Sequence, residues 1–344
     1  MIQKENKDNL INSDIDRELE VTLRPRVFDQ VIGREKEKRN LKIMIKAAKR
    51  RKEALDHILF HGPSGLGKTT LAHVLANELG VKIFITSGPA IERQGDLASI
   101  LTNIPKFGVL FIDEIHRLPK SVEEILYPVM EDKAIDIVIG KGPSARTLRL
   151  GLEDFSIVGA TTRIGLISAP LLNRFGACLR LDFYNNDELR DIVFQKAGIL
   201  KVDIDAIAAY EIAKRSRGTA RIAIRHLKRV RDYIEVNNID RIKLSEVEKV
   251  LDMYEVDKEG LDYIDRKILR WIIKDLDGGP VGVSTIAAAF FEEVSTIEEV
   301  YEPYLIKAGF LKRTPRGRVV TEKAYKHLDL KQTKNALKKQ RKLI

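Results

Sequence analysis

The residues with the clearest chemical spacing lie in the stretch HGPSGLGKTT, which begins at residue 61. The apolar run HILF precedes it and LAHVLANEL follows it, so the sequence predicts a buried strand, a turn and a helix in that order. Gly62, Gly65 and Gly67 allow backbone N–H groups to point at phosphate oxygens, and the helix N-terminus adds a partial positive charge. We therefore predict a phosphate loop for a nucleoside triphosphate, in which Lys68 reaches the β- and γ-phosphates and Thr69 ligates Mg²⁺.

Two more apolar runs end in polar residues. GVLFIDEIHRL places Asp113 and Glu114 at the end of one run, and FSIVGATTR ends in Thr161, Thr162 and Arg163. Ligands of open α/β sheets bind at the carboxyl ends of parallel strands. We expect Asp113 to hold Mg²⁺ through water, Glu114 to orient and polarise the attacking water, and a polar residue of the second run to contact the γ-phosphate. The simpler alternative is that the two carboxylates cap the next helix.

Two arginines lie where a phosphate contact is plausible. Arg174 in LLNRFG ends a helix-like segment and can face the site of a neighbouring subunit. Supplied in trans, such an arginine raises the rate of hydrolysis about 10³–10⁵-fold. Arg221 in SRGTARIAIRHL begins a basic amphipathic helix. For each arginine the alternative is a structural role, such as an ion pair within the chain.

The charge of the protein is concentrated near its end. The net charge is +10, and residues 305–344 hold thirteen Lys or Arg against two acidic residues, so the other 304 residues carry about −1. A polyanionic partner is therefore expected for the last segment. No apolar run approaches the length of a membrane span, and the single cysteine, Cys178, excludes an internal disulfide framework. We expect Cys178 to be buried and the protein to be cytoplasmic.

Periodicity divides the chain into four parts. Residues 1–184 predict an α/β P-loop ATPase domain, whose residues 1–20 form a polar, flexible arm. From 185 to 257 apolar residues recur at every third and fourth position, which predicts a small all-helical lid. Residues 258–330 contain three amphipathic helices and a hairpin pattern, which predict a winged helix, and 331–344 form a basic tail.

The hairpin pattern FLKRTPRGRVVT carries positive charge without an acidic residue. The helix before it contains three glutamates between residues 298 and 302, which would repel phosphates and argue against a helix that reads bases. We predict contacts with a nucleic-acid backbone that do not depend on sequence. The alternative is a hairpin that is simply soluble. The predicted contacts are Lys312, Arg313, Arg316 and Arg318.

A second hairpin pattern, AIDIVIGKGPSARTLRL, follows the acidic pair and its helix. Ile135, Ile137 and Ile139 fall at every second position, so they share one apolar face of the first strand, and GKGPS forms the tip. From spacing alone this face either docks on a partner protein or packs on its own sheet.

These segments, together and in this order, resemble the AAA+ ATPase family, and within it the bacterial motors that drive branch migration of Holliday junctions. The likeness covers roughly residues 20–330 and includes LRPRVFDQVIG, GPSGLGKTTLA, LFIDEIHRL, GKGPSAR, GATTR and YEPYLIKAGFLKRTPRGRVVT. The sequence departs from the family pattern at Ala220, where a proline is usual, at Lys133, where an aromatic residue is usual, and at Val294, where many members have an arginine.

The resemblance implies roles for the matching residues. Asp113 and Glu114 would be the magnesium-associated and water-activating pair, and Thr162 would be the first sensor. Arg174 would be the arginine finger in trans, and Arg221 would be the second sensor. Arg313 and Arg318 would contact DNA. The implied ATP contacts are Leu23, Arg24, Ile32, Gly33, Gly62, Gly65, Gly67, Lys68, Thr69, Thr70, Glu131, Asp132, Lys133, Arg174, Tyr184 and Arg221.

The resemblance also implies what the protein does. It implies hexameric rings that use ATP and Mg²⁺ to move duplex arms of a four-way junction, with a junction-binding protein docked on the hairpin of Ile135 and a junction resolvase acting later. Two alternatives belong to other classes: an initiator-type DNA-binding switch and a clamp-loader-like assembly factor. Neither accounts for the GKGPSAR and RTPRGR segments.

Overall fold

The computed structural model describes residues 22–139 and 146–331, and their side chains except those of 137–139, 146 and 147. The chain divides into two compact units, Met1–Phe183 and Tyr184–Ile344. In the described residues no helix combines the length and the apolar character that a membrane crossing requires. Within the second unit, residues 184–257 are called the lid and residues 258–331 the head.

A parallel sheet forms the centre of the first unit. In the part of the chain that the structure describes, its strand order is β2 (Ile83–Ser87), β3 (Val109–Asp113), β6 (Ser156–Thr161), β1 (Ile58–His61) and β7 (Ala177–Arg180), and all neighbouring pairs are parallel. The strands β1, β3 and β6 are almost wholly buried, which explains their continuous apolar sequences. The predicted α/β fold class is confirmed.

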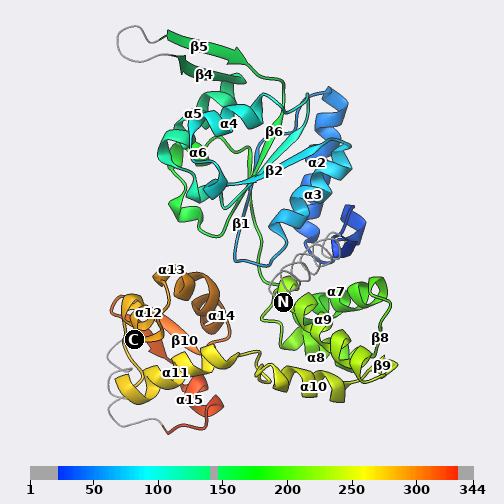
Figure 1. Ribbon diagram of the computed structural model, residues 1–344, viewed down its shortest axis with the longest axis vertical. Coiled ribbons are helices and arrows are strands. Elements are labelled where there is room, and N and C mark those ends of the chain that lie inside the picture. Colours follow the sequence, from blue (N-terminus) through cyan, green and yellow to red (C-terminus); the bar gives the residue numbers. More distant parts are fainter. Residues whose placement is uncertain (1–21, 140–145, 332–344) are drawn as a thin grey trace, which may run out of the picture. The chain divides into compact units, whose positions relative to one another are not determined.

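Helices cover both faces of this sheet (Figure 1). On one side lie α2 (Glu35–Arg51) and α3 (Lys68–Leu79), and on the other lie α4 (Gln94–Leu101), α5 (Lys120–Asp132) and α6 (Ala169–Leu172). Leu110 and Ile112 of β3 pack with Leu126 of α5 and Leu171 of α6 in one apolar core. Short 3₁₀ turns, η1 (Phe28–Gln30), η2 (Gly88–Ala90), η3 (Ile115–Arg117) and η5 (Ile164–Leu166), connect these elements.

The predicted hairpin between α5 and β6 is present. Strands β4 (Ala134–Ile139) and β5 (Arg146–Gly151) pair antiparallel, with Ala134 opposite Gly151, and project outward from the first unit (Figure 1). Ile135 is 1% exposed and belongs to the core of its own unit, whereas Leu148 on β5 is 45% exposed. The side chains of Ile137 and Ile139 lie outside the described residues, as does the tip.

Cys178 corrects an expectation from the sequence. It is exposed rather than buried. It lies on β7, which pairs with β1 at one margin of the sheet, and residues along β7 alternate between half-buried and exposed. The apolar residues around Cys178 therefore form an edge strand, and one face of this strand points outward.

The lid is helical, as predicted. It contains α7 (Asn186–Ile199), α8 (Ala206–Lys214), α9 (Ala220–Val236) and α10 (Leu244–Met253), with a two-residue parallel pair, β8 (Asp203–Ile204) and β9 (Arg241–Ile242). The side chain of Asn185 accepts from the backbone N of Glu188, and the Glu188 carboxylate accepts from the backbone N of Asn185. This reciprocal cap fixes where α7 begins.

The head has the elements of a winged helix, which confirms that part of the predicted fold. They are α11 (Tyr263–Leu276), α12 (Val283–Phe290), α13 (Val294–Thr296), α14 (Glu302–Lys307), β10 (Leu311–Thr314), β11 (Gly317–Val320) and α15 (Glu322–His327). The predicted third helix is irregular, because a π-helical turn, η6 (Ile297–Tyr301), separates α13 from α14. Pro303 lacks the N–H that a regular helix would use there, which accounts for the widened turn before it.

Candidate nucleotide site and nucleic-acid interface

The phosphate loop joins the carboxyl end of β1 to the first turn of α3. Gly62, Gly65 and Gly67 have φ of 144°, 78° and 91°, in the left-handed region that favours glycine. A Cβ atom at Gly62 would lie 2.3 Å from the carbonyl oxygen of Leu181, so this position also excludes a side chain by contact. The backbone geometry thus has the form that an anion-binding loop requires.

Lys68 lies inside this loop. The residue is 7% exposed, and Nζ donates to the carbonyl oxygens of Gly62 at 2.7 Å and Pro63 at 3.0 Å. An ammonium group at this position adds positive charge to the loop, and a phosphate is a favourable ligand for such a group.

Thr69 and Asp113 bring two oxygen ligands to the same edge of the sheet. The Thr69 hydroxyl donates to Oδ2 of Asp113 across 3.4 Å. Adjacent ligands of an octahedral Mg²⁺ are about 2.9 Å apart at the usual metal–oxygen distances. A hydroxyl and a carboxylate beside the phosphate loop are therefore the donors that a magnesium–triphosphate complex would use.

Glu114 is held in position by several groups. Its φ of 47° is left-handed, and its backbone N donates to Oδ1 of Asp113 at 3.0 Å. The hydroxyl of Thr162 donates to Oε2 of Glu114 at 3.2 Å, which brings the ends of β3 and β6 together as predicted. His116 Nδ1 lies 3.2 Å from the same oxygen and 2.9 Å from the hydroxyl of Thr161. The contacts of His116 with Glu114 and Thr161 were not predicted from the sequence, although His116 follows Glu114 by two residues in the same motif.

The segment that holds the first of the implied ATP contacts, Leu23 to Gly33, lies beside the loop. Arg34 donates from Nη2 to the carbonyl oxygen of Leu66 at 3.4 Å, which places the adjoining Ile32 and Gly33 next to the phosphate loop. Leu23 is buried, and Arg24 lies close enough to α3 to lower the pKa of His73, an effect second to that of burial.

Four predicted ATP contacts lie at the amino ends of the parallel strands, opposite the ends that carry the phosphate loop. Arg174 donates from Nη2 to Glu131 Oε2 at 3.1 Å and from Nη1 to the carbonyl oxygen of Pro170 at 2.7 Å, and its guanidinium stacks 4.5 Å from the centre of the Tyr127 ring. Asp132 pairs with Arg149 of β5 at 2.7 Å. Within one chain, the alternative of a structural ion pair is therefore what the structure shows for Arg174.

Lys133 contacts His57, the residue immediately before β1, and this contact shows at which end of the strands Lys133 lies. Lys133 Nζ is 3.1 Å from His57 Nε2, and the backbone N of Ile157 donates to His57 Nδ1 at 2.8 Å. Burial, and secondarily the charge of Lys133, lowers the pKa of His57 to about 4. The phosphate loop begins at the other end of β1, a strand length of about 13 Å away. Glu131, Asp132, Lys133 and Arg174 therefore lie away from the phosphate loop of their own chain, and their predicted contacts with a nucleotide remain predictions.

Tyr184 and Arg221 belong to the second unit. Tyr184 is 8% exposed, and its backbone N donates to the carbonyl oxygen of Gly218 at 2.9 Å. Arg221 lies in the first turn of α9, at the helix end where an anion is favoured. The local setting fits the predicted roles, which remain predictions.

In the head, the wing is the hairpin of β10 and β11, residues 311–320. Lys312, Arg313 and Arg316 are exposed. Arg318 differs: its side chain is 8% exposed and pairs with Glu302 at 2.8 Å and with Glu298 at 3.2 Å. The charge of Arg318 is thus already paired inside the head, which gives this residue a structural role, and its predicted DNA contact remains a prediction.

The position of Arg318 in the sheet explains its burial. It lies opposite Arg313 in the hairpin, and its backbone also exchanges two hydrogen bonds with Val281, at 2.7 and 3.0 Å. Glu298 and Glu302 of the irregular third helix accept hydrogen bonds from this arginine. From the sequence alone, only their repulsion of phosphates was expected. Val294, where an arginine would be usual, is 39% exposed.

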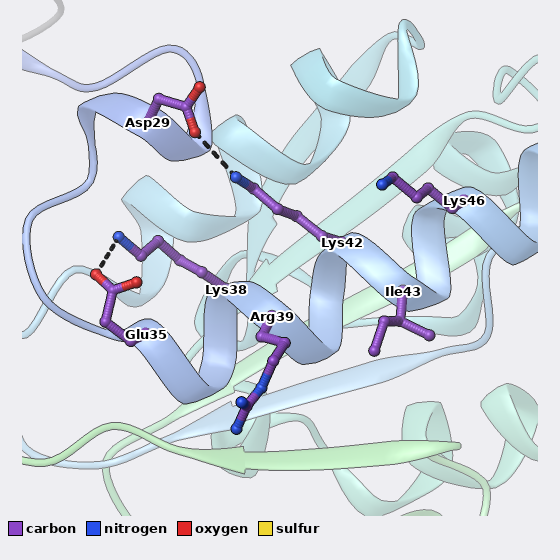
Figure 2. Close-up of a pocket in the computed structure, with 7 residues that line it drawn as sticks. All are labelled: Asp29, Glu35, Lys38, Arg39, Lys42, Ile43 and Lys46. Atoms are coloured by element: carbon purple, nitrogen blue, oxygen red, sulfur yellow. Dashed lines mark hydrogen bonds and ion pairs between the residues drawn. The ribbon is translucent and has the colours of Figure 1, made fainter.

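A basic hollow that the sequence did not indicate lies along α2. It has a volume of about 520 Å³ and is lined by Asp29, Glu35, Lys38, Arg39, Lys42, Ile43 and Lys46. Figure 2 shows that Lys42 pairs with Asp29 and Lys38 with Glu35, so half of its positive side chains are compensated. Its lining does not include Asp113 or Glu114, and the lining residues carry a net charge of only +2.

Comparisons with known proteins agree with this geometry. Family models match three consecutive regions: the Holliday junction DNA helicase RuvB P-loop domain at residues 23–181, the RuvB AAA lid domain at 184–257 and the RuvB C-terminal winged helix domain at 258–329. The Holliday junction branch migration complex subunit RuvB of Clostridium kluyveri is 58% identical over 314 residues, which cover 91% of this chain and 90% of that protein.

Solved structures give the same result. The Thermotoga maritima RuvB Holliday junction branch migration motor matches with a TM-score of 0.83 and 52% identity, over 90% of this chain and 99% of that one. The Aeropyrum pernix ORC2 protein matches with a TM-score of 0.55 at 16% identity, over 93% of this chain and 96% of that one, which indicates a shared fold.

The parallel sheet, the phosphate loop with its acidic pair and the helical lid define a nucleotide-binding AAA+ P-loop ATPase that carries a winged helix. Within that class, the chain belongs to the RuvB family.

Proposed function

We propose that this protein is an ATP-driven DNA motor that forms hexameric rings on duplex arms and drives branch migration of Holliday junctions in recombination and repair. The observation that supports it most is the set of Lys68, Thr69, Asp113 and Glu114 at one sheet edge, in a chain of the RuvB family. We further propose the domain boundaries 1–184, 185–257 and 258–330, a basic tail over 331–344, and action in the cytoplasm.

Hydrolysis begins with the positioning of water. Glu114 polarises a water molecule and accepts its proton while the water oxygen attacks the γ-phosphorus and the bond to the β–γ bridging oxygen breaks. Lys68 stabilises the charge that moves onto the phosphate oxygens, and Thr162 orients Glu114 through their hydrogen bond. Mg²⁺, held by Thr69 and Asp113 when bound, supplies charge neutralisation at the β- and γ-phosphates. The products are ADP and phosphate.

Arg174 is proposed to complete the site of the next subunit. Its pairing with Glu131, whose side chain is 58% exposed, is a surface interaction of small free energy that a phosphate can displace. The sheet edge that carries Arg174, Glu131, Asp132 and Lys133 would then face the phosphate loop of a neighbour. This explains how residues far from their own loop can match nucleotide-contacting positions.

The DNA contacts are proposed to come from the exposed part of the wing. Lys312, Arg313 and Arg316 offer charges for the phosphate backbone without reading bases, which suits a motor that must move along any sequence. The projecting hairpin β4–β5 is proposed to dock a RuvA-like junction-binding protein, with Leu148 on its exposed surface. A RuvC-like resolvase would act on the same junction.

The central test uses a labelled four-way DNA junction with Mg²⁺–ATP and a RuvA-like partner. Dissociation of the junction into duplex arms is expected to require ATP, the partner and Lys68, with Lys68→Ala as the inactive variant. Hydrolysis of ATP while the junction stays intact would refute the motor and favour a loader.

A mixing experiment tests the origin of the arginine. Arg174→Ala and Lys68→Ala should each be inactive alone, because each lacks one half of every site. Mixed rings contain interfaces that combine an intact phosphate loop with an intact Arg174, so ATP hydrolysis should partly return. A mixture as inactive as its parts would show that Arg174 does not act in trans. Arg180→Ala, which alters an exposed pair with Asp182, serves as the control.

A further inference from the structure

The turn between α8 and α9 has an unusual backbone. Arg217 has φ of 55° and Gly218 has φ of 74°, so two consecutive residues are left-handed. Glycine adopts this conformation readily, whereas arginine does so only when surrounding contacts hold it there. The turn immediately precedes α9 and lies four residues before Arg221.

The contacts of Arg217 all reach toward the head. Its Nε donates to the carbonyl oxygen of Gly260 at 2.8 Å, and Nη2 lies 2.8 Å from Asp262 Oδ2 and 2.5 Å from Asp265 Oδ2. Its guanidinium also lies 5.3 Å from the centre of the Tyr304 ring. One lid side chain therefore binds a backbone carbonyl and two carboxylates of the head at once.

The two carboxylates are those that begin the first helix of the head. Asp262 is the N-cap of α11, and Asp262 and Asp265 accept hydrogen bonds from each other's backbone N at 2.9 and 3.1 Å. Asp265 is fully buried, and its Oδ1 has no hydrogen-bond partner among the described residues. Arg217 thus supplies the charge that a buried carboxylate at this helix end requires.

The same turn is joined to the beginning of the lid. The carbonyl oxygen of Gly218 accepts from the backbone N of Tyr184 at 2.9 Å. Tyr184 is the first residue of the second unit and follows directly on the first unit. Neighbouring residues of one turn therefore contact three features: Tyr184, the start of α9 with Arg221, and the start of α11.

Charged and titratable groups surround this cluster on several sides. Arg225 of α9 faces it as a second cation, and Tyr301, Tyr304, Glu259 and Glu292 lie around it in the head. Burial raises the pKa of Asp265 to about 7, and Arg217 opposes that increase. Removal of Arg217 alone would leave a poorly compensated carboxyl group, so a paired substitution is the appropriate perturbation.

We propose that Arg217 is a positioning residue that fastens the head to the turn before Arg221, so that lid and head move as one body. The inference rests on the proposed function only for its consequence, namely that the wing follows changes at the nucleotide. It does not require Arg217 to contact nucleotide or DNA.

Distance measurements between spin labels test the fastening directly. Cys178 is the single cysteine, so a Cys178→Ser background accepts labels at Val236→Cys in the lid and Phe291→Cys in the head, which are 81% and 97% exposed. With the labelled protein diluted into excess unlabelled Cys178→Ser protein, the parent should give one narrow distance distribution, unchanged by Mg²⁺–ADP or a non-hydrolysable ATP analogue. Arg217→Met/Asp265→Asn should lose the narrow peak. An equally narrow peak in this variant would overturn the proposal.

Two further variants serve as a control and as a milder perturbation. Lys323→Ala removes an exposed ion pair with Glu259 at the same junction and should retain the narrow peak. Arg217→Lys keeps the charge but cannot span Gly260 and both carboxylates, so it should broaden the distribution less. Thermal unfolding verifies that each variant is folded. If the paired variant does not fold, Arg217→Lys decides: a broader peak supports the fastening and an unchanged peak refutes it.

An activity measurement separates this inference from the proposed function. In the paired variant, ATP turnover without DNA should stay near the parent level, while its stimulation by duplex DNA should fall about fivefold or more, the usual scale of coupling between sites. Full stimulation would overturn the coupling. If the parent itself neither responds to DNA nor moves junctions, the proposed function fails, and the label distances still decide whether Arg217 fastens the head.

Discussion

At the phosphate edge of the sheet, the charged residues that the motifs predicted stand together at the ends of β1, β3 and β6. In the wing, one of the four predicted basic residues, Arg318, is instead buried against Glu298 and Glu302. Both predictions started from short motifs of similar length. They differ in how each motif acquires its geometry.

The phosphate loop is shaped by its own residues. Its glycines permit positive φ, and the strand before it and the helix after it follow from local patterns. In the wing, alternation predicted the hairpin, but the exposure of each arginine depends on what packs beside it. The bonds between Arg318 and Val281 join residues far apart in the sequence. The number of basic residues in the wing sequence therefore overestimates the positive charge that is exposed for binding DNA.

The largest expected effect is at the phosphate edge. Glu114→Gln removes the base while keeping a similar shape, so kcat for ATP hydrolysis should fall about 10²–10⁴-fold. Nucleotide affinity should change little, because Lys68 and the loop remain. Steady-state hydrolysis and equilibrium nucleotide binding measure the two quantities. Glu124→Gln, an exposed carboxylate on α5, is the control, and equal losses in both variants would contradict a catalytic role.

Arg318→Met should destabilise the head. Breaking a buried ion pair leaves Glu302, which is 5% exposed at its side chain, without its partner, at a cost of about 3–5 kcal/mol. Thermal and urea unfolding measure the loss. Arg318→Met/Glu302→Gln should recover much of it. If the single variant is as stable as the parent and only loses DNA affinity, Arg318 is a DNA contact after all.

A smaller effect is expected at the opposite edge of the sheet, where His57 is buried beside Lys133. Its pKa of about 4 is below the ordinary 6.5, so on acidification the unfolded chain gains a proton before the folded protein does. Stability should therefore fall by about 2 kcal/mol between pH 7 and pH 5 on account of this residue. Urea unfolding at both pH values compares the parent with His57→Gln, in which this part of the loss should vanish. An equal loss in both would exclude His57 as the cause.

The smallest effect concerns the exposed part of the wing. Arg313→Gln should weaken DNA binding uniformly across sequences and reduce the slope of log affinity against log salt by about 0.9. Titrations of two unrelated duplexes over a range of salt measure this slope. Lys326→Gln, which removes an exposed charge elsewhere on the head, should leave it nearly unchanged. A loss confined to one duplex would indicate base recognition instead.

Much of the fold was predictable because the patterns are local. The apolar runs of β1, β3 and β6, the helical periods of the lid and the start of α3 at Lys68 all follow from neighbouring residues. The break in the third helix of the head was missed, although Pro303 was a signal for it. Exposure of Cys178 was also missed, because apolar letters alone do not distinguish an edge strand from a central one.

The sequence by itself determined the phosphate loop, the acidic pair, the order of strands and helices, and the excess of positive charge near the end of the chain. These depend on residue type and on spacings of a few residues. Only the tertiary structure decided which charges remain open to a ligand. It placed Arg174 and Lys133 at the edge opposite their own loop, buried Arg318, and joined Arg217 to Asp265. The reason is that desolvation and ion pairing depend on groups brought together by folding, whose distance along the chain carries no signal.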